Sequence, residues 1–374
     1  MELTKKQEEG LKIAVERYKN KEAYTCIAGF AGTGKSTLVK FIIDALNIPH
    51  NKIAFVAYTG KAASVLAKKG NPGATTAHRL LYHTEELEDG TYIHTPRMSP
   101  EKDLKLIVVD EVSMLEKEQW DILMRWRVPV ICLGDPAQLP PIHEDNGVLA
   151  SPHVFLDEVV RQAQDSEIIR LSMDVRNGRY LRLNKGKDVW VIPSEDVSDK
   201  LLTTADIVLC GKNATRRGLN RRMRKSIWGD KYTDEPLNGD KCICLKNYWN
   251  EGNLTNGTIG FVHGIRKYDT KLFQPKMVAD FISESDGYFG DLHMDYQLFK
   301  NGLTTVNKDN WMKYPKPERP MEFDYANCIT VHKSQGSEYD RVVVFNEFLG
   351  DMDFWKRWAY TAITRSKDKL VIVM

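Results

Sequence analysis

The sequence lacks any long hydrophobic run. No window of about 18 uncharged apolar residues occurs in it, so we expect no membrane-spanning helix. The N-terminus has no basic start followed by an apolar segment, so we expect no signal peptide and a cytoplasmic protein.

Cysteine is scarce and is not spaced for metal binding. The single close pair, Cys242-x-Cys244, has no second pair at a zinc-binding spacing. The cysteines stand mostly within apolar runs that are typical of core strands: Cys26, Cys132, Cys210, Cys242, Cys244 and Cys328. We therefore expect buried, reduced thiols in preference to disulfides or a metal site.

An excess of charge of one sign is also lacking. The chain has 53 basic and 51 acidic residues, which leaves a formal net charge of +2. The field of the whole molecule is therefore weak, and a polyanion would have to meet a local basic groove. The 374 residues, 42% hydrophobic and 28% charged, match a soluble globular protein of two or three domains.

A glycine-rich turn between an apolar run and a helical pattern is the strongest signal present. In this turn Gly29, Gly34, Lys35 and Ser36 match the phosphate-loop pattern G-x-x-x-x-G-K-[ST]. Backbone N–H groups of such a loop face phosphates, the lysine reaches the β- and γ-phosphates, and the serine hydroxyl binds Mg²⁺. The residues expected to hold ATP here are Gly29, Ala31, Gly32, Thr33, Gly34, Lys35, Ser36 and Thr37. The alternative is a glycine-rich turn without a ligand.

Two adjacent acids, Asp110 and Glu111, end an apolar Leu-Ile-Val-Val run. Asp110 can hold Mg²⁺ through water, opposite Ser36, and Glu111 can orient and deprotonate the attacking water. The alternative is a pair of solvated acids at a strand end. The phosphate loop earlier in the chain favours the hydrolytic interpretation.

Two glutamines each have a functional and an ordinary interpretation. Gln7 fits a capping box with Thr4, and alternatively its amide can read the edge of an adenine. Gln138 lies in the loop 134–141 after a strand, where its amide can sense the γ-phosphate; the alternative is an ordinary loop glutamine.

Arg161 and Arg365 are candidates for contacts to the leaving phosphates. A guanidinium placed there is worth about 10³–10⁵ in rate. Taken alone, either arginine would be assigned as a surface ion-pair partner.

The order of patterns along the chain predicts an α/β fold with insertions. Strands alternate with helices at the spacing of parallel sheets, whose ligands bind at the carboxyl ends of the strands. Residues 83–103 are polar and contain the turn signal Asp89-Gly90, which predicts a small hairpin. Residues 240–325 are rich in Gly, Asn, Asp and aromatics, which predicts a small β-rich insertion.

Two further groups of residues can contact a nucleic acid. Residues 212–225 form an expected helix with seven basic and no acidic residues, which can contact phosphates or form a solvated face. Tyr288, Phe289 and Trp311 can stack on bases, although such aromatics are more typical of the core of a small β unit.

Six short segments are distributed along nearly the whole chain. The first three are Gly29-Phe-Ala-Gly-Thr-Gly-Lys-Ser-Thr, Tyr58-Thr-Gly-Lys-Ala-Ala and Val109-Asp-Glu-Val-Ser-Met. The last three are Leu133-Gly-Asp-Pro-Ala-Gln-Leu-Pro-Pro, Val331-His-Lys-Ser-Gln-Gly-Ser-Glu-Tyr-Asp and Tyr360-Thr-Ala-Ile-Thr-Arg. Together they resemble the motifs of superfamily 1 helicases, and most of all those of the RecD/Dda branch.

The resemblance implies two RecA-like parallel-sheet domains with ATP and Mg²⁺ in the cleft between them. The first would span residues 1–148 and carry a strand-separating hairpin, or pin, at about 83–103. The second would span 149–240 and 326–374, and residues 241–325 would form an SH3-like insertion.

The resemblance also implies roles for single residues. Arg161 and Arg365 would reach the phosphates from the second domain, and Gln7 would read the adenine. Gly336 would lie near the γ-phosphate and Glu338 near the ribose. The path of single-stranded DNA would pass Thr59, Lys61, His78, Thr330 and His332.

The implied activity is ATP-dependent unwinding of duplex DNA by 5′-to-3′ translocation on a single strand. We expect a monomer in a bacterial or phage-infected cell. Its expected partners are single-stranded DNA and junctions of single and double strands, with single-strand-binding, replisome or repair proteins as candidates.

Two departures from the family pattern leave an alternative open. Tyr58 replaces the usual proline, which removes one DNA contact and offers a ring for stacking. The segment 83–103 is short, with Tyr92 the one aromatic near its turn. A weak pin favours a single-strand-stimulated ATPase or translocase that displaces proteins without efficient unwinding.

Two other classes of protein fit less well. A P-loop enzyme such as a kinase would leave the segments around His332 and Arg365 unexplained. A binding module with an inactive site is disfavoured because the hydrolytic set, with Lys35 and Glu111, is intact.

Overall fold

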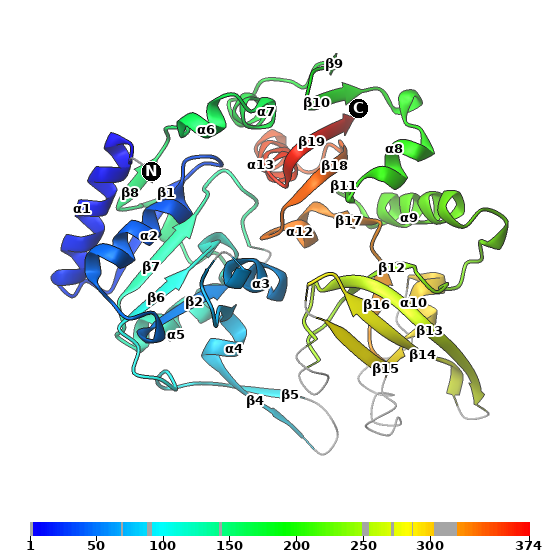
Figure 1. Ribbon diagram of the computed structural model, residues 1–374, viewed down its shortest axis with the longest axis horizontal. Coiled ribbons are helices and arrows are strands. Elements are labelled where there is room, and N and C mark those ends of the chain that lie inside the picture. The colour runs from blue at the N-terminus through cyan, green and yellow to red at the C-terminus, as the bar shows by residue number, and fades with distance from the viewer. Residues whose placement is uncertain are drawn as a thin grey trace.

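Two α/β lobes lie side by side, and a β-rich unit lies next to the second of them (Figure 1). The computed structural model describes residues 3–68, 70–87, 92–141, 144–248, 254–270, 273–285, 287–302 and 320–374. None of the helices in these ranges is long and apolar enough to cross a bilayer.

The first lobe is built on a six-stranded sheet whose neighbours are all parallel. Its strands in spatial order are β3 (Thr75–Thr76), β2 (Ile53–Ala57), β6 (Leu106–Val109), β7 (Val130–Gly134), β1 (Tyr24–Gly29) and β8 (Val154–Leu156). The helices of this lobe are α1 (Lys5–Lys19), α2 (Lys35–Leu46), α3 (Gly60–Lys68), α4 (Ala77–Leu81) and α5 (Lys117–Arg125).

Alternation along the strands explains why helices cover both faces of this sheet. Ile107 and Val109 pack into one core with residues of α4 and α5. Leu106 and Val108 point the other way and pack with residues of α1 and α2. The strand β6 is therefore apolar at every position, as expected in a parallel sheet buried on both sides.

The second lobe has the same construction. Its strands in spatial order are β17 (Cys328–Thr330), β11 (Ile207–Cys210), β18 (Tyr339–Phe345), β19 (Ser366–Val373), β10 (Val189–Ile192) and β9 (Asn184–Lys185). All pairs are parallel except β9 with β10. The helices are α6 (Arg161–Gln164), α7 (Glu167–Arg176), α8 (Asp199–Thr204), α9 (Asn213–Trp228), α12 (Val331–Ser334) and α13 (Met352–Ile363). Residues of α7 and α13 pack on one face and residues of α8 and α9 on the other.

The β-rich unit is an antiparallel sheet inserted into the second lobe. Its strands in spatial order are β15 (Tyr288–Met294), β14 (Phe273–Ser283), β13 (Ile259–Thr270), β12 (Lys241–Cys244) and β16 (Phe323–Tyr325), and α10 (Tyr296–Asn301) packs against it. A separate hairpin, β4 (Tyr82–Glu86) with β5 (Tyr92–Pro96), extends from the first lobe (Figure 1). The predicted turn Asp89-Gly90 and the predicted aromatic Trp311 lie outside the described residues.

The predicted fold class is confirmed, with two parallel α/β sheets, a hairpin and a β-rich insertion. All six cysteines are buried and free, as expected. Phe289 belongs to the core of the β-rich unit, as expected. The expectation that its neighbour Tyr288 lies in the same core is wrong, because Tyr288 is 65% exposed. Successive strand residues face opposite sides, so only one of the two can enter the core.

Most basic residues of α9 have acidic partners, which neither interpretation of residues 212–225 anticipated. The pairs are Arg216–Asp324 at 2.6 Å, Arg221–Asp234 at 3.8 Å, Arg222–Asp199 at 2.6 Å and Arg224–Asp240 at 2.8 Å. Arg224 and Asp240 are almost completely buried, and Arg224 also donates to the backbone oxygens of Thr233 and Glu235. This helix therefore fastens the β-rich unit to the second lobe.

Removing the acid of this buried pair should destabilise the protein strongly. Asp240→Ala would leave the Arg224 guanidinium buried without its carboxylate, so we expect the free energy of unfolding to fall by about 3–5 kcal/mol. Urea denaturation measures this value. The matched control is Asp121→Ala, which breaks the half-exposed pair with Lys117 and should cost about 1 kcal/mol or less. Equal losses in both variants would contradict the assignment.

Candidate functional site

The carboxyl ends of three neighbouring strands of the first lobe meet at one edge of the sheet. Gly29 ends β1, Asp110 and Glu111 follow β6, and Asp135 follows β7. The register pairs Ala28 of β1 with Gly134 of β7, so their continuations leave the sheet together. The phosphate loop and both acidic segments therefore lie at one edge, where parallel sheets bind ligands.

The phosphate loop has a tight conformation that depends on glycine. Gly32 and Gly34 have φ angles of +75° and +78°, which disfavour any other residue. The Lys35 ammonium donates to the backbone oxygens of Gly29 at 2.8 Å and Phe30 at 3.0 Å, so it lies across the loop. The remaining predicted ATP-binding residues lie in the loop or in the first turn of α2: Ala31, Thr33, Ser36 and Thr37.

Gln7 supports the loop from α1. Its Oε1 accepts from the Thr4 N–H at 2.9 Å, and the capping box is complete. Its Nε2 donates to the Thr33 backbone oxygen at 3.0 Å, and a Cβ on Gly34 would lie 2.4 Å from this nitrogen. The capping interpretation of Gln7 is therefore confirmed, and its adenine-reading role stays a prediction.

Charged groups from both lobes act on the Glu111 carboxyl. Burial raises its pKa, the positive charge of Arg365 opposes this, and the negative charge of Asp110 adds to it. The charge of Lys35 also acts on the same carboxyl. Glu111 has a φ of +54°, a strained conformation for a residue with a side chain and one that is concentrated at functional sites.

Arg365 reaches this centre from the second lobe. It is 4% exposed, and its guanidinium donates to the backbone oxygens of Thr361 and Ser337, each at 3.1 Å, and to the Thr364 hydroxyl at 3.2 Å. The alternative assignment of Arg365 as a surface ion-pair partner is therefore wrong. Arg161 is the first residue of α6, but its side chain lies outside the described part of the chain.

Gln138 provides an unsatisfied polar atom near the same cleft. Its side chain is 6% exposed, and its Oε1 has no hydrogen-bond partner among the described residues. A buried acceptor without a partner indicates a place that water or a ligand completes.

Two other predicted nucleotide contacts follow α12. Gly336 has a φ of +71°, and a Cβ there would lie 3.0 Å from the Ala62 side chain, at the start of α3. Glu338 lines a cavity of about 880 Å³. Their roles towards the γ-phosphate and the ribose stay predictions.

Three of the five predicted DNA contacts line one cavity of about 310 Å³, which we call the interlobe groove. Thr59 and His78 enter it from the first lobe and His332 from the second. Lys61 lines the 880 Å³ cavity instead, and Thr330 precedes α12 as its N-cap.

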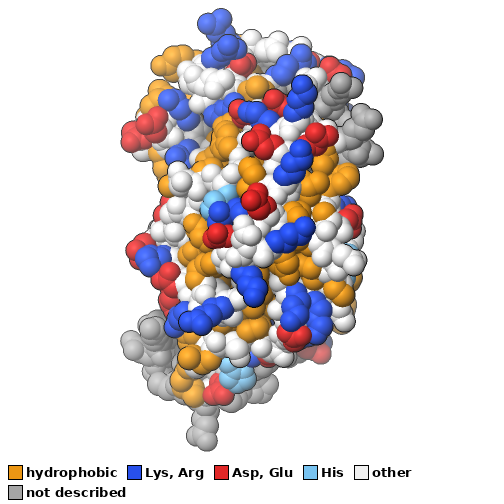
Figure 2. Space-filling model, turned by 90° about the vertical axis from the view of Figure 1, so that its left-hand side faces the viewer, with side chains coloured by type: hydrophobic (Ala, Val, Ile, Leu, Met, Phe, Trp, Pro, Cys, Tyr) orange, Lys and Arg blue, Asp and Glu red, His pale blue; other side chains and the backbone are white. Residues whose placement is uncertain are grey.

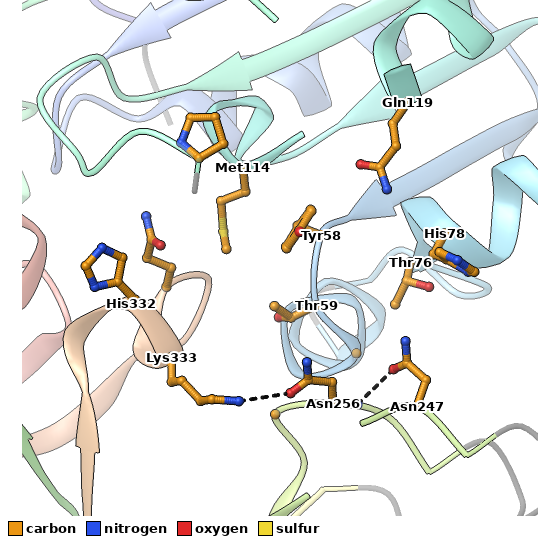
Figure 3. A pocket seen from close by; sticks show the side chains of 14 residues that line it. Tyr58, Thr59, Thr76, His78, Met114, Gln119, Asn247, Asn256, His332 and Lys333 are labelled. Atoms are coloured by element: carbon orange, nitrogen blue, oxygen red, sulfur yellow. Dashed lines mark hydrogen bonds between the residues drawn. The ribbon is translucent and has the colours of Figure 1, made fainter. Parts of the chain in front are cut away.

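All three parts of the molecule contribute to the interlobe groove (Figure 3). The Lys333 ammonium donates to the Asn256 side chain at 3.3 Å, and the Asn256 N–H donates to Asn247 Oδ1 at 2.9 Å. Tyr58 lies in the groove, where a ring had been expected in place of proline. The residues that sequence reasoning missed here include Met114, Gln119, Pro141, Asn247, Asn256, Lys333 and Gln335. No local pattern marks the two asparagines, because only the docking of the β-rich unit brings them to the groove.

The His78 ring is held by two other rings. It stacks on Tyr82 with centroids 4.7 Å apart, and the ring of His94, from the hairpin, lies perpendicular to it with centroids 4.3 Å apart. Burial lowers the pKa of His78 to about 4, and the nearby His94 adds to this shift. His78 is thus a neutral, flat surface at the wall of the groove.

These features define a two-lobed P-loop ATPase whose catalytic cleft receives residues from both lobes. A family described as the AAA domain matches residues 2–189, and the UvrD-like helicase C-terminal domain matches residues 325–373. The ATP-dependent DNA helicase dda of Enterobacteria phage T4 is 31% identical over 98% of this chain and 98% of that protein. The chain belongs to the superfamily 1 helicases, in the RecD/Dda branch.

Other relatives agree with this membership. The ATP-dependent RecD2 DNA helicase of Deinococcus radiodurans is 27% identical over 92% of this chain, which spans 46% of that protein. The Pif1 helicase of Candida albicans superposes with a TM-score of 0.56 at 19% identity, over all of this chain and 94% of that chain. Bacteroides Pif1 in complex with ADP-AlF3 and single-stranded DNA gives a TM-score of 0.57 at 17% identity, over all of this chain and 92% of that chain. At this identity the solved structures support the fold alone.

The environment of His78 can be measured directly by NMR titration of the ring signals, assigned with a His78→Asn variant. We expect a pKa of about 4 in the native protein, because burial and His94 disfavour the imidazolium. Unfolded His78 titrates near its ordinary value of about 6.5, so its contribution to stability falls as the pH drops from about 6.5 towards 4. A native pKa of about 6.5 would contradict this packing.

Proposed function

We propose that this protein is a DNA helicase that moves 5′-to-3′ along a single strand and opens the duplex ahead of it. Membership of the family makes it an ATP-hydrolysing helicase; the direction of movement, the residue roles and Mg²⁺ are the proposed parts. The observation that carries the proposal is the buried Arg365 of the second lobe, whose positive charge opposes the rise in pKa that burial causes at the Glu111 carboxyl of the first.

Each step of hydrolysis has a residue suited to it. Lys35 and the loop N–H groups hold the β- and γ-phosphates. The hydroxyl of Ser36 and the carboxylate of Asp110 are hard oxygen donors of the kind that Mg²⁺ prefers. When bound, Mg²⁺ neutralises charge on the phosphates. Glu111 accepts the proton of the attacking water. For this role its side chain must be in the carboxylate form.

Two residues respond to the γ-phosphate. Gln138 has a buried acceptor without a described partner, so it suits the position beside the attacking water. Arg365 stabilises the charge that develops on the transferred phosphoryl group. We propose the same task for Arg161, and this rests on the family resemblance alone.

The base of the nucleotide has a cavity available beside the loop. A space of about 520 Å³ opens next to Thr4, between residues 157–164 and α7. Gln7 borders the loop on this side through Thr33. A base there can exchange the present hydrogen bonds of the Gln7 amide for those of an adenine edge. We propose that Gly336 contacts the γ-phosphate and Glu338 the ribose, and this rests on the family resemblance alone.

The interlobe groove is the proposed path of single-stranded DNA. Flat rings at Tyr58 and His78 can stack on bases, and Lys333 and the asparagines offer polar contacts to the backbone. Figure 2 shows basic and acidic side chains interspersed on one face, and the net charge is only +2. The proposed path therefore rests on the residues of the groove and not on a general attraction of polyanions. We propose further contacts from Lys61 and Thr330 at its borders.

Movement follows from a site that is divided between lobes. ATP favours the closed cleft because both lobes contact it, and loss of the γ-phosphate removes contacts that favoured closure. DNA that both lobes grip with alternating strength is then drawn along.

We propose domain limits that follow the sheets. The first domain carries the hairpin at about 83–103 and runs through β8 (Val154–Leu156), which pairs with β1, and so does not end at 148 as the resemblance implied. The second comprises the following residues up to 240 together with 326–374, and the β-rich unit spans 241–325. A monomeric state, a cell of bacterial or phage-infected type, and single-strand-binding or replisome partners are further proposals from the resemblance.

The hairpin favours a second candidate function. Between its base at Tyr82 and its turn, β4 and β5 carry one aromatic, Tyr92, in the described strands. A wedge with so little aromatic surface suits a translocase that displaces proteins without efficient unwinding.

Strand separation on tailed duplexes tests the proposal. We expect ATP-dependent unwinding of a duplex with a 5′ single-stranded tail and none with a 3′ tail, measured by release of a fluorescent strand. Displacement of streptavidin from biotinylated single strands is measured in parallel. Unwinding from the 3′ tail would overturn the direction. Streptavidin displacement without unwinding of either duplex would establish the second candidate instead.

Arg365→Ala should lower kcat of the DNA-stimulated ATPase by about 10³ with KM for ATP nearly unchanged, because the guanidinium acts on the transition state. Steady-state phosphate release gives both constants, and thermal unfolding verifies that the variant is folded. Arg179→Ala, which removes an exposed arginine of the same lobe paired with Asp174, is the control and should behave as wild type. An effect confined to KM would show that Arg365 serves binding alone.

A further inference from the structure

A tyrosine hydroxyl of the second lobe binds the phosphate loop of the first. Tyr360, in α13, is fully buried. Its hydroxyl accepts from the Ala31 N–H at 2.8 Å and donates to Asp135 Oδ2 at 2.7 Å. One oxygen atom thus links the loop after β1, the loop after β7 and α13.

The hydroxyl is fixed as the donor to Asp135. Burial raises the pKa of the Tyr360 phenol far above its usual value, and the Asp135 carboxylate raises it further. The phenol therefore stays protonated. Because its hydrogen points to Asp135, its lone pair is directed at the Ala31 N–H, which sets the orientation of that peptide in the loop.

The next residue of α13 holds the far end of the same loop. Thr361 Oγ1 accepts from the Leu139 N–H at 2.9 Å. The Leu139 carbonyl accepts from Gln335 Nε2 at 3.2 Å. The Leu139 side chain is fully buried in the core of the second lobe. The loop 135–139 is therefore held by α13 at both of its ends.

This connection begins at the interlobe groove. Gln335 lines the groove, and so does Pro141, two residues beyond Leu139. A strand that occupies the groove contacts Gln335 and the end of the 135–141 segment directly. From there, hydrogen bonds pass through Leu139 and Thr361 to α13, and Tyr360 continues to the phosphate loop.

We propose that Tyr360 is a positioning residue that couples occupancy of the interlobe groove by a single strand to the geometry of the phosphate loop. The element with two states is the docking of loop 135–139 on α13, since both sites contact it. Tyr360 touches no reacting atom. It acts by setting the Ala31 peptide and the Asp135 carboxylate when the lobes are docked. This inference rests on the proposed function of the groove.

Tyr360→Phe removes the hydroxyl and keeps the ring. ATP hydrolysis is measured with and without oligo-dT, and the Kd for a fluorescent oligo-dT by anisotropy. We expect the stimulation of kcat by oligo-dT to fall about tenfold, which is within the range that one mutation between two coupled sites produces. The Kd for oligo-dT should stay within about twofold, because Tyr360 does not line the groove. The rate without oligo-dT is measured as the reference for the stimulation, since the variant also alters a contact to the phosphate loop.

A matched pair at the neighbouring position gives an independent measurement. Thr361→Val removes the acceptor of the Leu139 N–H at nearly constant shape and should lose stimulation, whereas Thr361→Ser keeps the acceptor and should retain it. Tyr325→Phe is the control for removing the hydroxyl of a buried tyrosine. The Tyr325 hydroxyl donates to the Asp234 carbonyl at 3.2 Å, and this bond belongs to neither the groove nor the phosphate loop. This variant should be stimulated as wild type.

The outcomes separate this inference from the function on which it rests. If oligo-dT does not stimulate the wild-type enzyme, the proposed function fails. If wild type responds and Tyr360→Phe responds equally, or changes in KM only, the coupling role is overturned. Should Tyr360→Phe unfold at the assay temperature, the Thr361 pair decides: equal stimulation of the valine and serine variants overturns the inference, and loss in valine alone supports it.

Discussion

Leu139 belongs to a loop of the first lobe, but its side chain is buried in the core of the second. The other arrangements of the cleft depend on this insertion. With Leu139 in place, Thr361 and Gln335 bind its backbone, and Arg357 donates to the carbonyl oxygens of Pro136 and Gln138 at 3.1 and 3.4 Å. The same docking places α13 so that Tyr360 meets the phosphate loop and Arg365 comes near Glu111. The phosphate loop, the loop 135–139 and α13 are thus held together by hydrogen bonds and by a buried leucine that crosses between the lobes.

A loop that contacts both binding regions gives the two lobes a common mechanical element. Asp135 is at the end nearest the phosphate loop, and Pro141 is at the end nearest the interlobe groove. Neither region can change its grip on this segment without an effect on the other, since the residues between them are fixed by hydrogen bonds to α13. This is a physical basis for coupling that does not require long-range motion within either sheet. Each sheet, buried on both faces, can move as a rigid body.

The parts of this arrangement that are local in the chain could be predicted, and those that depend on docking could not. The phosphate loop and the acids at Asp110 and Glu111 were visible because a strand, a turn and a helix follow one another directly in the sequence. The partners of α9 were not, since Asp324 comes from the β-rich unit and Asp240 from the segment that leads into it. The asparagines of the groove and the bond from Tyr360 to Ala31 belong to the same class. Gln7 shows a third situation, in which a capping pattern and a nucleotide contact use the same amide, and only the first can be verified without the nucleotide.

The strength of the contact at loop 135–139 suits a structure that must open and close. Burial of one leucine contributes about 1.5–3 kcal/mol, and each hydrogen bond adds about 0.5–1.5 kcal/mol net, because water replaces it on opening. A ligand must prefer one state by about 5.5 kcal/mol to move an equilibrium from 1:99 to 99:1. The loop contacts are of that order, so contacts made by a nucleotide on both lobes can outweigh them or be outweighed by them. A much larger apolar interface would hold the lobes together more strongly than such a ligand could oppose. Polar bonds around a buried leucine therefore suit the proposed cycle, in which the cleft closes on ATP and opens when the γ-phosphate is lost.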